Sequence, residues 1–523
     1  MFRFGLKNIR RLKSVDPIEL RRITLLVGRN SSGKSTFLRT LPLLRQSILT
    51  KTSSPILWFG DYVDFGSFQN AVSSNDEGKT ISLQFEIDDV NVRLGTRFSH
   101  RGVFGEKRTY NNVHLSMAFQ PYGARTISAI KLSLDEEDHF EMFLGTEADL
   151  RRVTLNGEDV SSLYKGWEIY LSHQSFFPEV VVVAREGTRK QAAPFMPGRS
   201  TALVSEPLPN RLRELVPDEM PDEEVSDFIG TLLGLPDLTE HTLVRAASVL
   251  QSGWRNALYE IIENQHTEAF AQLRKIWRVN AALPVLEEVS RRLRRILTEV
   301  LYIGPARASS QRYYRYQDLA ISGIDPDGKN FPMFLNSLGE DQIDSFSDWV
   351  ERLFGYRVVV SPIPGHISIE LSDGVAKTNI VDTGYGVSQV LPVLGQIWWA
   401  SNKQWSGNLF QNDGASIVAI EQPELHLHPA HQALLADALA EPPTPSYAPE
   451  SSKPSFIVET HSETLVNRLG QLVGEGRLKP SDVQIVLFEP DDLDSRQTNV
   501  SISRYGDQGQ LLDWPYGFFQ SPI

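Results

Sequence analysis

The sequence predicts an α/β fold in which a sheet with covering helices is joined to an antiparallel β lobe and a helical insertion. Three observations support this prediction. An apolar run at 23–27 leads through a glycine-rich loop into a segment with helical spacing, and further apolar runs occur at 417–421 and 456–460. Short runs of alternating polarity, separated by Asn, Asp and Gly, lie between 81 and 144. Segments of helical spacing dominate from 211 to 299.

The glycine-rich loop at 28–36, GRNSSGKST, fits the pattern G-x-x-x-x-G-K-[ST] without a mismatch. Strands are expected at 1–9 and 18–27 and a helix at 34–48, which is the strand–loop–helix context that this motif requires. Its glycines and backbone amides cradle phosphates, its lysine reaches the β- and γ-phosphates, and its serine hydroxyl holds Mg²⁺. ATP and Mg²⁺ are therefore the expected cofactors. The expected nucleotide-binding residues here are Asn30, Ser31, Gly33, Lys34, Ser35 and Thr36.

The rest of the chain divides into three regions by its pattern. Residues 1–149 hold the loop and then the β lobe, with strands expected at 81–87, 90–98, 113–119, 127–134 and 139–144. Residues 150–299 are expected to form the helical insertion, with helices at 211–215, 223–233, 242–264, 267–278 and 283–299. Residues 300–523 return to alternating strands and helices, including a strand at 301–305, a helix at 346–354 and a hairpin at 358–360 and 367–371.

Composition excludes several classes of function. The chain of 523 residues has no cysteine, which rules out disulfides and thiol catalysis and suits a reducing cytoplasm. No apolar stretch approaches the roughly 18–20 residues of a membrane span, so no membrane partner is expected. The net charge of −13 disfavours wrapping DNA. Basic clusters at 151–152, 291–295 and 307–315 nevertheless leave local DNA contact open.

A second set of residues can complete a nucleotide site. Glu421 ends the apolar run at 417–421, as expected of an acid that binds Mg²⁺. Gln422 follows it and can orient a water molecule but cannot take a proton, so hydrolysis is expected to be slow, with Glu424 as an alternative base. His461 follows the next strand, where it could contact the γ-phosphate, and Ser462 is a candidate N-cap for a helix from 463.

Two further polar segments near this region allow more than one interpretation. Glycines at 384 and 386 lead to Ser388, which is expected to cap a helix and offer an anion site, with Pro392 in the first turn. His426, His428 and His431 have a spacing seen in metal sites. Because no cysteine or clustered carboxylate accompanies them, they are expected to form a loop instead.

The order of these motifs resembles the ABC-type ATPase heads of the SMC, RecF and OLD group, with a long insertion between the phosphate loop and the later segments. Five short sequence segments resemble those of prokaryotic OLD-like AAA ATPases. They are 62–68, 302–307, 386–392, 420–429 and 513–519, and the last of them reads DWPYGFF. The resemblance covers both ends of the chain and omits the helical insertion. It implies an ABC-type head whose site residues are Glu421, Gln422 and His461 for catalysis and Ser35 with Glu421 for the metal.

The same resemblance implies partners. ATP would lie between the phosphate loop of one subunit and the Ser388 segment of another, in a homodimer or a higher homo-oligomer. The function implied is an ATP-dependent sensor or regulatory switch of an anti-phage defence system. It would control a separate nuclease effector of HNH or TOPRIM type, as the ATPase subunits of Septu and PARIS do. The alternative is a RecF-like maintenance ATPase that acts directly on DNA.

Overall fold

The structure is a computed structural model of the 523-residue chain. It describes residues 2–52, 54–73, 80–92, 107–120, 127–145, 149–164, 167–171, 176–177, 180–186, 189–194, 221, 228, 231–249, 252–263, 267–317, 321, 323–402, 416–444, 453–490 and 497–515. The helix expected at 211–215 and most of the one expected at 223–233 lie outside these residues, as do 93–98 of an expected strand and the final 516–519 of the DWPYGFF segment.

A seven-stranded sheet with helices on its faces confirms the predicted α/β class. Its first five strands run parallel, and the sixth and seventh are antiparallel to their neighbours. Strand β3 carries the glycine-rich loop and has β19 and β20 beside it. Across the sheet the strands are β13 (Leu301–Ile303), β18 (Ile417–Glu421), β19 (Ser455–Glu459), β3 (Ile23–Gly28), β20 (Val483–Pro490), β21 (Thr498–Tyr505) and β22 (Leu511–Leu512).

The two faces of this sheet belong to two different hydrophobic cores. Ile23, Leu25 and Val27 of β3 join one core and Leu26 joins the other, because successive side chains of a strand point to opposite faces. Helix α1 (Lys34–Leu49) contributes to the core of Leu26. The opposite core is built with α10 (Tyr385–Asn402), α11 (Pro429–Ala440) and α12 (Glu463–Gly474). Burial on both faces explains why these strands read as continuous apolar runs.

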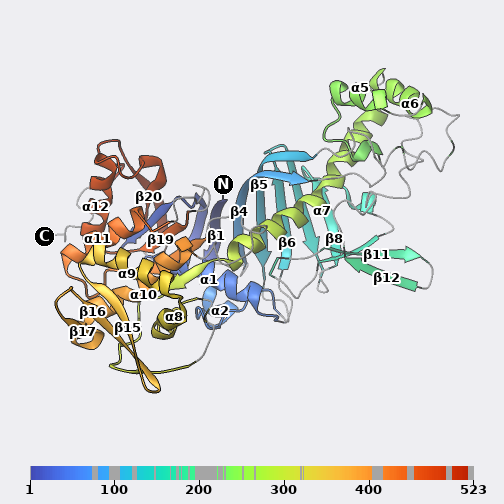
Figure 1. Cartoon of the computed structure of the whole chain (residues 1–523). Helices are drawn as coiled ribbons and strands as arrows, with labels where there is room; N and C mark the ends of the chain where they lie inside the picture. The colour runs from blue at the N-terminus through green and yellow to red at the C-terminus, as the bar shows by residue number, and fades with distance from the viewer. Residues whose placement is uncertain are drawn as a thin grey trace.

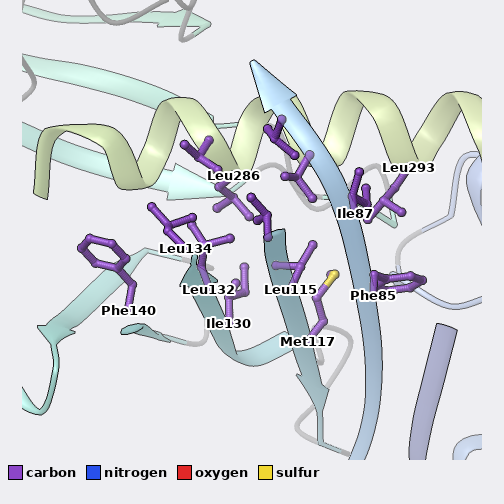
Figure 2. Close-up of a cluster of buried hydrophobic side chains, with 14 of the residues drawn as sticks. Phe85, Ile87, Leu115, Met117, Ile130, Leu132, Leu134, Phe140, Leu286 and Leu293 are labelled. Atoms are coloured by element: carbon purple, nitrogen blue, oxygen red, sulfur yellow. The ribbon is translucent and has the colours of Figure 1, made fainter. Parts of the chain in front are cut away.

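An eight-stranded antiparallel sheet forms the β lobe (Figure 1). Buried positions alternate from Val113 to Phe119, and Figure 2 shows Phe85 and Ile87 on the same face as Leu115 and Met117. In order across the sheet the strands are β2 (Leu12–Glu19), β1 (Phe2–Ile9), β4 (Ile81–Val92), β5 (Arg108–Phe119), β6 (Ile127–Leu134), β7 (Asp138–Leu144), β8 (Leu150–Leu155) and β9 (Glu158–Asp159). The lobe sheet therefore passes the predicted boundary at 149.

Residues 150–194 contain strands, so the prediction that the insertion is helical from its first residue is wrong. Besides β8 and β9, this part holds a three-stranded sheet of β10 (Trp167–Leu171), β11 (Val180–Glu186) and β12 (Arg189–Pro194), with the short helix η1 (Ser161–Tyr164) before it. The run VVVVARE in β11 is rich in β-branched residues, which is the signal that predicts a strand.

Helix α7 (Glu268–Thr298) lies across the β lobe, with Leu286 and Leu293 on its buried side (Figure 2). The sequence predicted two helices here, because Pro284 lacks the amide that would bond to the carbonyl of Asn280. Every residue from 279 to 286 is buried, so packing on all sides holds the helix through this gap. Conversely, the helix expected at 242–264 is two helices, α5 (Glu240–Val249) and α6 (Ser252–Glu263), which Figure 1 shows at the far end of α7.

Smaller elements complete the fold. The expected hairpin is confirmed as β15 (Arg357–Ile363) and β16 (His366–Ser372). The other short elements are α2 (Phe68–Ala71), β14 (Tyr314–Arg315), α8 (Phe331–Ser337), α9 (Glu340–Phe354), β17 (Lys377–Asn379), η3 (Ile380–Asp382) and η6 (Pro480–Asp482). Within the described residues, no helix has the length and apolar character needed to cross a bilayer.

The contact between α7 and the lobe gives a stability prediction. Leu286 is completely buried against the lobe, so Leu286→Ala should lower the free energy of unfolding by about 2–5 kcal/mol, as is usual for core leucines. Thermal and denaturant unfolding of the purified chain measures this. Leu49→Ala is the matched control, because Leu49 is 54% exposed and its truncation should change stability little. Equal effects of the two substitutions would contradict the packing.

Candidate functional site

The glycine-rich loop joins β3 to α1, which confirms the predicted strand–loop–helix arrangement. Gly28 ends β3, where a Cβ would stand 2.3 Å from the carbonyl oxygen of Phe488 on β20, so a larger residue does not fit. Gly33 precedes the helix with a φ of 102°, a conformation that glycine adopts without strain. The loop thus brings its backbone amides to the N-terminus of α1, which is an arrangement that binds anions.

Lys34 and Ser35 turn their side chains toward this loop and toward β19. The ammonium group of Lys34 donates to the carbonyls of Gly28 at 3.1 Å and Arg29 at 2.9 Å, and burial lowers its pKa. It lies 3.8 Å from a carboxylate oxygen of Glu459. The hydroxyl of Ser35 donates to the same oxygen at 2.9 Å. The two residues expected to contact phosphate and Mg²⁺ therefore lie together.

The remaining loop residues differ in exposure. Asn30 and Ser31 are exposed on the outer turn, and Ser31 has a left-handed φ of 61°. Thr36 is buried in the first turn of α1, where its carbonyl accepts a hydrogen bond from Thr40 at 2.7 Å. Asn30 and Ser31 are therefore open to solvent, whereas Thr36 is not.

Two acids end neighbouring strands beside the loop. Glu421 on β18 and Glu459 on β19 are paired in register, and their side chains are only 2% and 3% exposed. The carboxyl ends of parallel strands form the usual ligand-binding edge of an α/β sheet. The loop after β3 lies at the same edge, since β19 also pairs with β3. The fold therefore gathers two buried carboxylates next to the predicted phosphate site.

Glu421 was expected to hold Mg²⁺, and in the structure both of its oxygens accept hydrogen bonds from protein groups. The guanidinium of Arg39 on α1 donates to the two oxygens at 2.7 Å each, in a bidentate pair. The hydroxyl of Tyr302 on β13 donates at 2.8 Å. Glu421 thus connects α1, β13 and β18.

Glu459 has a different environment. One oxygen accepts from Ser35, and the other is buried without a hydrogen-bond partner among the described residues. Burial raises the pKa of this carboxyl, and Ser35 and Lys34 act in the opposite direction. An unsatisfied buried carboxylate oxygen is costly, so this side chain is suited to receive a further ligand.

Gln422 occupies a strained turn directly after β18. Its φ is 43°, which is uncommon for a residue other than glycine. Its backbone N–H donates to the backbone carbonyl of Glu459 at 2.8 Å. Arg307 fixes the same turn, because its guanidinium donates to the carbonyls of Glu421 at 2.8 Å and Gln422 at 3.3 Å. Burial lowers the pKa of Arg307 to about 10. Strain of this kind is concentrated at functional sites.

Glu424 and His461 face each other across the ends of β18 and β19. The backbone amide of His461 donates to one carboxylate oxygen of Glu424 at 2.7 Å, and the other oxygen is buried without a partner among the described residues. Burial raises the pKa of Glu424. Desolvation and the nearby positive charge of Lys34 lower the pKa of His461. The predicted cap is confirmed, since the hydroxyl of Ser462 accepts from the amide of Leu465 at 3.0 Å.

Ser388 is not a helix cap, and the prediction that it is one was wrong. Helix α10 begins at Tyr385, so Ser388 lies inside the first turn and Pro392 lies in the helix interior. Pro392 has no amide hydrogen and so cannot donate the usual hydrogen bond of a residue in a helix interior. Ser388 is 6% exposed, and a Cβ on Gly386 would stand 2.4 Å from the carbonyl oxygen of His426. The start of α10 therefore lies against the loop that follows β18.

The histidines after β18 have structural contacts. His428 caps α11, and its ring accepts from the amide of Ala430 at 3.2 Å. The ring of His431 lies 5.6 Å from that of Phe354, measured between centroids. His426 adopts a left-handed φ of 64° in the turn. These contacts match the expectation of a loop.

Sequence reasoning missed four residues of this site: Arg39, Tyr302, Arg307 and Glu459. Glu459 had a usable signal, because it ends an apolar strand as Glu421 does. Tyr302 and Arg307 lie in the YIGPAR segment that was noted only for its resemblance to a family. Arg39 had no signal, since a single arginine in a helix is common.

Residues 255–467 match the family model described as "AAA domain, putative AbiEii toxin, Type IV TA system". The match spans β18, β19 and Glu421 to His461, covers less than half of the chain, and does not include the glycine-rich loop. No curated protein sequence matches the chain.

Among solved structures, three SMC head domains are similar over almost the whole length. One SMC head bound to the C-terminal winged-helix domain of ScpA has 12% identity and a TM-score of 0.32, covering 96% of this chain and 97% of that one. An SMC head from Pyrococcus furiosus, bound to the C-terminal domain of ScpA, has 12% identity and a TM-score of 0.32, covering 96% of both chains. The SMC head from Thermotoga maritima has 9% identity and a TM-score of 0.32, covering 95% and 97%.

The strand order and the site define the class of protein. A phosphate-loop strand is separated by one strand from the strand that carries a buried acid, and an antiparallel lobe is attached at the N-terminal side. Together with the glycine-rich loop, this arrangement is an α/β P-loop fold, and residues 255–467 of it resemble an AAA domain.

The environment of Glu424 gives a pH-dependent prediction. Its pKa in the folded chain is raised above the ordinary value of 4.5, so its contribution to stability is present at low pH and is lost as the pH rises through the raised pKa. Glu424→Gln stays neutral and should raise the melting temperature relative to wild type more at pH 8 than at pH 5. Thermal unfolding at both pH values measures this. Glu260→Gln is the control on an exposed helix face, and an equal pH-dependent gain there would contradict the prediction.

Proposed function

We propose that this chain binds Mg·ATP and hydrolyses it slowly, and that it acts as a switch rather than as a motor. One observation carries the proposal: Lys34 and Ser35 of the phosphate loop lie beside a buried carboxylate at the carboxyl edge of the sheet. A buried lysine and a serine hydroxyl in this loop are the groups that contact phosphate oxygens and Mg²⁺ in P-loop proteins.

The donor set fits Mg²⁺, which prefers oxygen ligands and is usually held by one or two carboxylates together with phosphate oxygens and water. The hydroxyl of Ser35 and the unpartnered oxygen of Glu459 are such ligands, and Glu421 is adjacent. When bound, the cation would neutralise charge on the phosphates. The loop amides and Lys34 hold and orient the phosphates, and His461 is placed at the strand end where the terminal phosphate would face it.

Slow hydrolysis follows from the two residues that could handle the attacking water. Gln422 can orient a water molecule but cannot accept its proton. Glu424 can accept a proton, but one of its oxygens already accepts a hydrogen bond from the amide of His461. Because phosphoryl transfer depends mainly on positioning and charge, turnover continues at a reduced rate. The chain would then stay in its ATP-bound state for a long time, and the slow hydrolysis step would set how long that state lasts.

We further propose that ATP holds two copies of this head together, with the start of α10 around Ser388 facing the nucleotide of the other copy. A homodimer or a higher homo-oligomer would result. The glycines at 384 and 386 and the N-terminus of α10 supply backbone amides there.

The biological role proposed is that of a cytoplasmic sensor or regulatory switch in prokaryotic anti-phage defence, controlling a separate nuclease of HNH or TOPRIM type. The similarity of residues 255–467 to an AAA domain of a putative toxin from a toxin–antitoxin system supports a role in defence rather than in metabolism.

Direct action on DNA, the RecF-like alternative, is less well supported by the basic clusters of the sequence. Arg292 donates to the backbone carbonyls of Asp88 and Asp89, and Arg294 donates to that of Phe177. Three other arginines of the clusters form ion pairs: Arg151 with Asp149, Arg152 with Asp159, and Arg312 with Asp382. These cations already have partners in the chain, and the net charge is −13.

Lys34→Ala tests the proposal directly. The substitution should weaken ATP binding by about 100-fold, since hydrogen bonds to charged groups are worth roughly 1.5–3 kcal/mol each. It should also abolish ATP-dependent dimerisation. Calorimetry with a non-hydrolysable analogue and light scattering provide the two measurements. Lys131→Ala, at a lysine that is 62% exposed in the lobe, should leave both unchanged. Wild-type affinity in a folded Lys34→Ala variant would refute the ATP site.

Gln422→Glu tests the reason for slow turnover. A carboxylate at this position restores a general base and should raise the rate of ATP hydrolysis by about 100-fold or more if the side chain faces the attacking water. Steady-state phosphate release is the measurement. Glu424→Gln is the comparison variant: unchanged turnover in Gln422→Glu together with loss of turnover in Glu424→Gln would assign the base to Glu424 instead.

A further inference from the structure

Two buried acids lie near Ser35, the residue predicted to bind Mg²⁺, and they differ in the groups that already donate hydrogen bonds to them. Glu421 and Glu459 are neighbours in register on parallel strands, and both are almost completely buried. The sequence favours Glu421, because it ends a buried apolar strand and a distinctive segment, QPELHLHP, follows it. Their hydrogen bonds lead to the opposite choice.

Every oxygen of Glu421 has a donor. Arg39 bonds both oxygens and Tyr302 adds a second bond to one of them, with distances of 2.7–2.8 Å. Bidentate arginine–carboxylate pairs are among the stronger hydrogen-bonded contacts in proteins. The Glu421 side chain is 2% exposed and that of Arg39 is 31% exposed, so loss of Arg39 would leave a buried carboxylate without its cation, which is destabilising. For Glu421 to bind a cation directly, Arg39 would have to leave it.

Glu459 lacks such a partner. Its first oxygen accepts only the Ser35 hydroxyl at 2.9 Å, and its second oxygen is buried with no hydrogen bond among the described residues. Lys34 is 3.8 Å away, too far for a hydrogen bond, and its ammonium group donates to two loop carbonyls instead. Glu459 therefore offers a buried carboxylate oxygen, next to the motif serine, that has no competing donor among the described residues and could accept a cation as a ligand.

We propose that Glu459, at the end of β19, is the acid that holds Mg²⁺ together with Ser35, and that Arg39 and Tyr302 keep Glu421 as a structural link between α1, β13 and β18. This assignment rests on the proposed ATP function. It divides two tasks, cation binding and fixation of the strand edge, between two adjacent acids.

The test uses the purified full-length chain with Mn²⁺ as the probe in place of Mg²⁺. Electron paramagnetic resonance measures Mn²⁺ affinity in the presence of a non-hydrolysable ATP analogue, and calorimetry measures nucleotide affinity without metal. Glu459→Gln should weaken Mn²⁺ binding by about 10- to 100-fold, the range found when even an outer partner of a metal is lost. Its metal-free nucleotide affinity should stay near that of wild type.

Glu421→Gln is the matched comparison. It should retain Mn²⁺ affinity and instead lower the melting temperature, because Arg39 loses a charged partner. The assignment is overturned if Glu421→Gln loses Mn²⁺ and Glu459→Gln keeps it. If Glu459→Gln does not fold, Glu459→Asp and Glu421→Asp replace the pair. Shortening the carboxylate should then weaken Mn²⁺ binding several-fold at position 459 only, and equal affinities in the two Asp variants would overturn the assignment.

These measurements separate the two levels of the proposal. A wild-type chain that binds neither the analogue nor Mn²⁺ refutes the ATP function and the assignment with it. A chain that binds nucleotide normally in every variant but loses Mn²⁺ only at position 421 refutes the assignment alone.

Discussion

The hydrogen-bonded ion pair between Arg39 and Glu421 is the interaction on which the rest of the site depends. It joins the helix that follows the phosphate loop to the strand that carries the second motif, over 382 positions of sequence. Tyr302 adds the neighbouring strand β13. The Glu421 carboxylate is almost completely buried while Arg39 is 31% exposed, and the bidentate geometry of the pair fixes the direction in which α1 is held against the edge of the sheet.

Around this fixed point, the polar groups fall into two kinds. The side chain of Arg307 and the backbone N–H of Gln422 donate hydrogen bonds that hold the turn after β18 in its strained conformation. Glu424 and Glu459 each keep one buried oxygen without a partner, and burial raises the pKa of both. Burial of apolar side chains in the two hydrophobic cores on the faces of the sheet offsets the free-energy cost of these unpartnered buried oxygens. The satisfied groups give the site its shape, and the unsatisfied ones give it its chemistry.

The sequence predicted the elements that have strong local signals. The loop from Gly28 to Thr36, the strand ending at Glu421 and the cap at Ser462 were all found, because a motif, a continuous apolar run and a polar residue before a helix are visible locally. It did not predict that α7 continues through Pro284, since only the surrounding core makes that possible. The partners of Glu421 were also missed, because long-range pairing leaves no trace in a single sequence.

The unbroken helix α7 has a mechanical consequence. With 31 residues at 1.5 Å per residue, the helix is about 46 Å long. Figure 1 shows it running from the side of the seven-stranded sheet to α5 and α6. Its C-terminal end leads within a few residues to β13, and Arg45 of α1 donates to the carbonyl of Val300 in between. Because a helix of this length is stiff, a small rotation at the end next to Tyr302 becomes a larger displacement at the end next to α5 and α6. A tilt of about 5° at its base would displace its outer end by roughly 4 Å at that length.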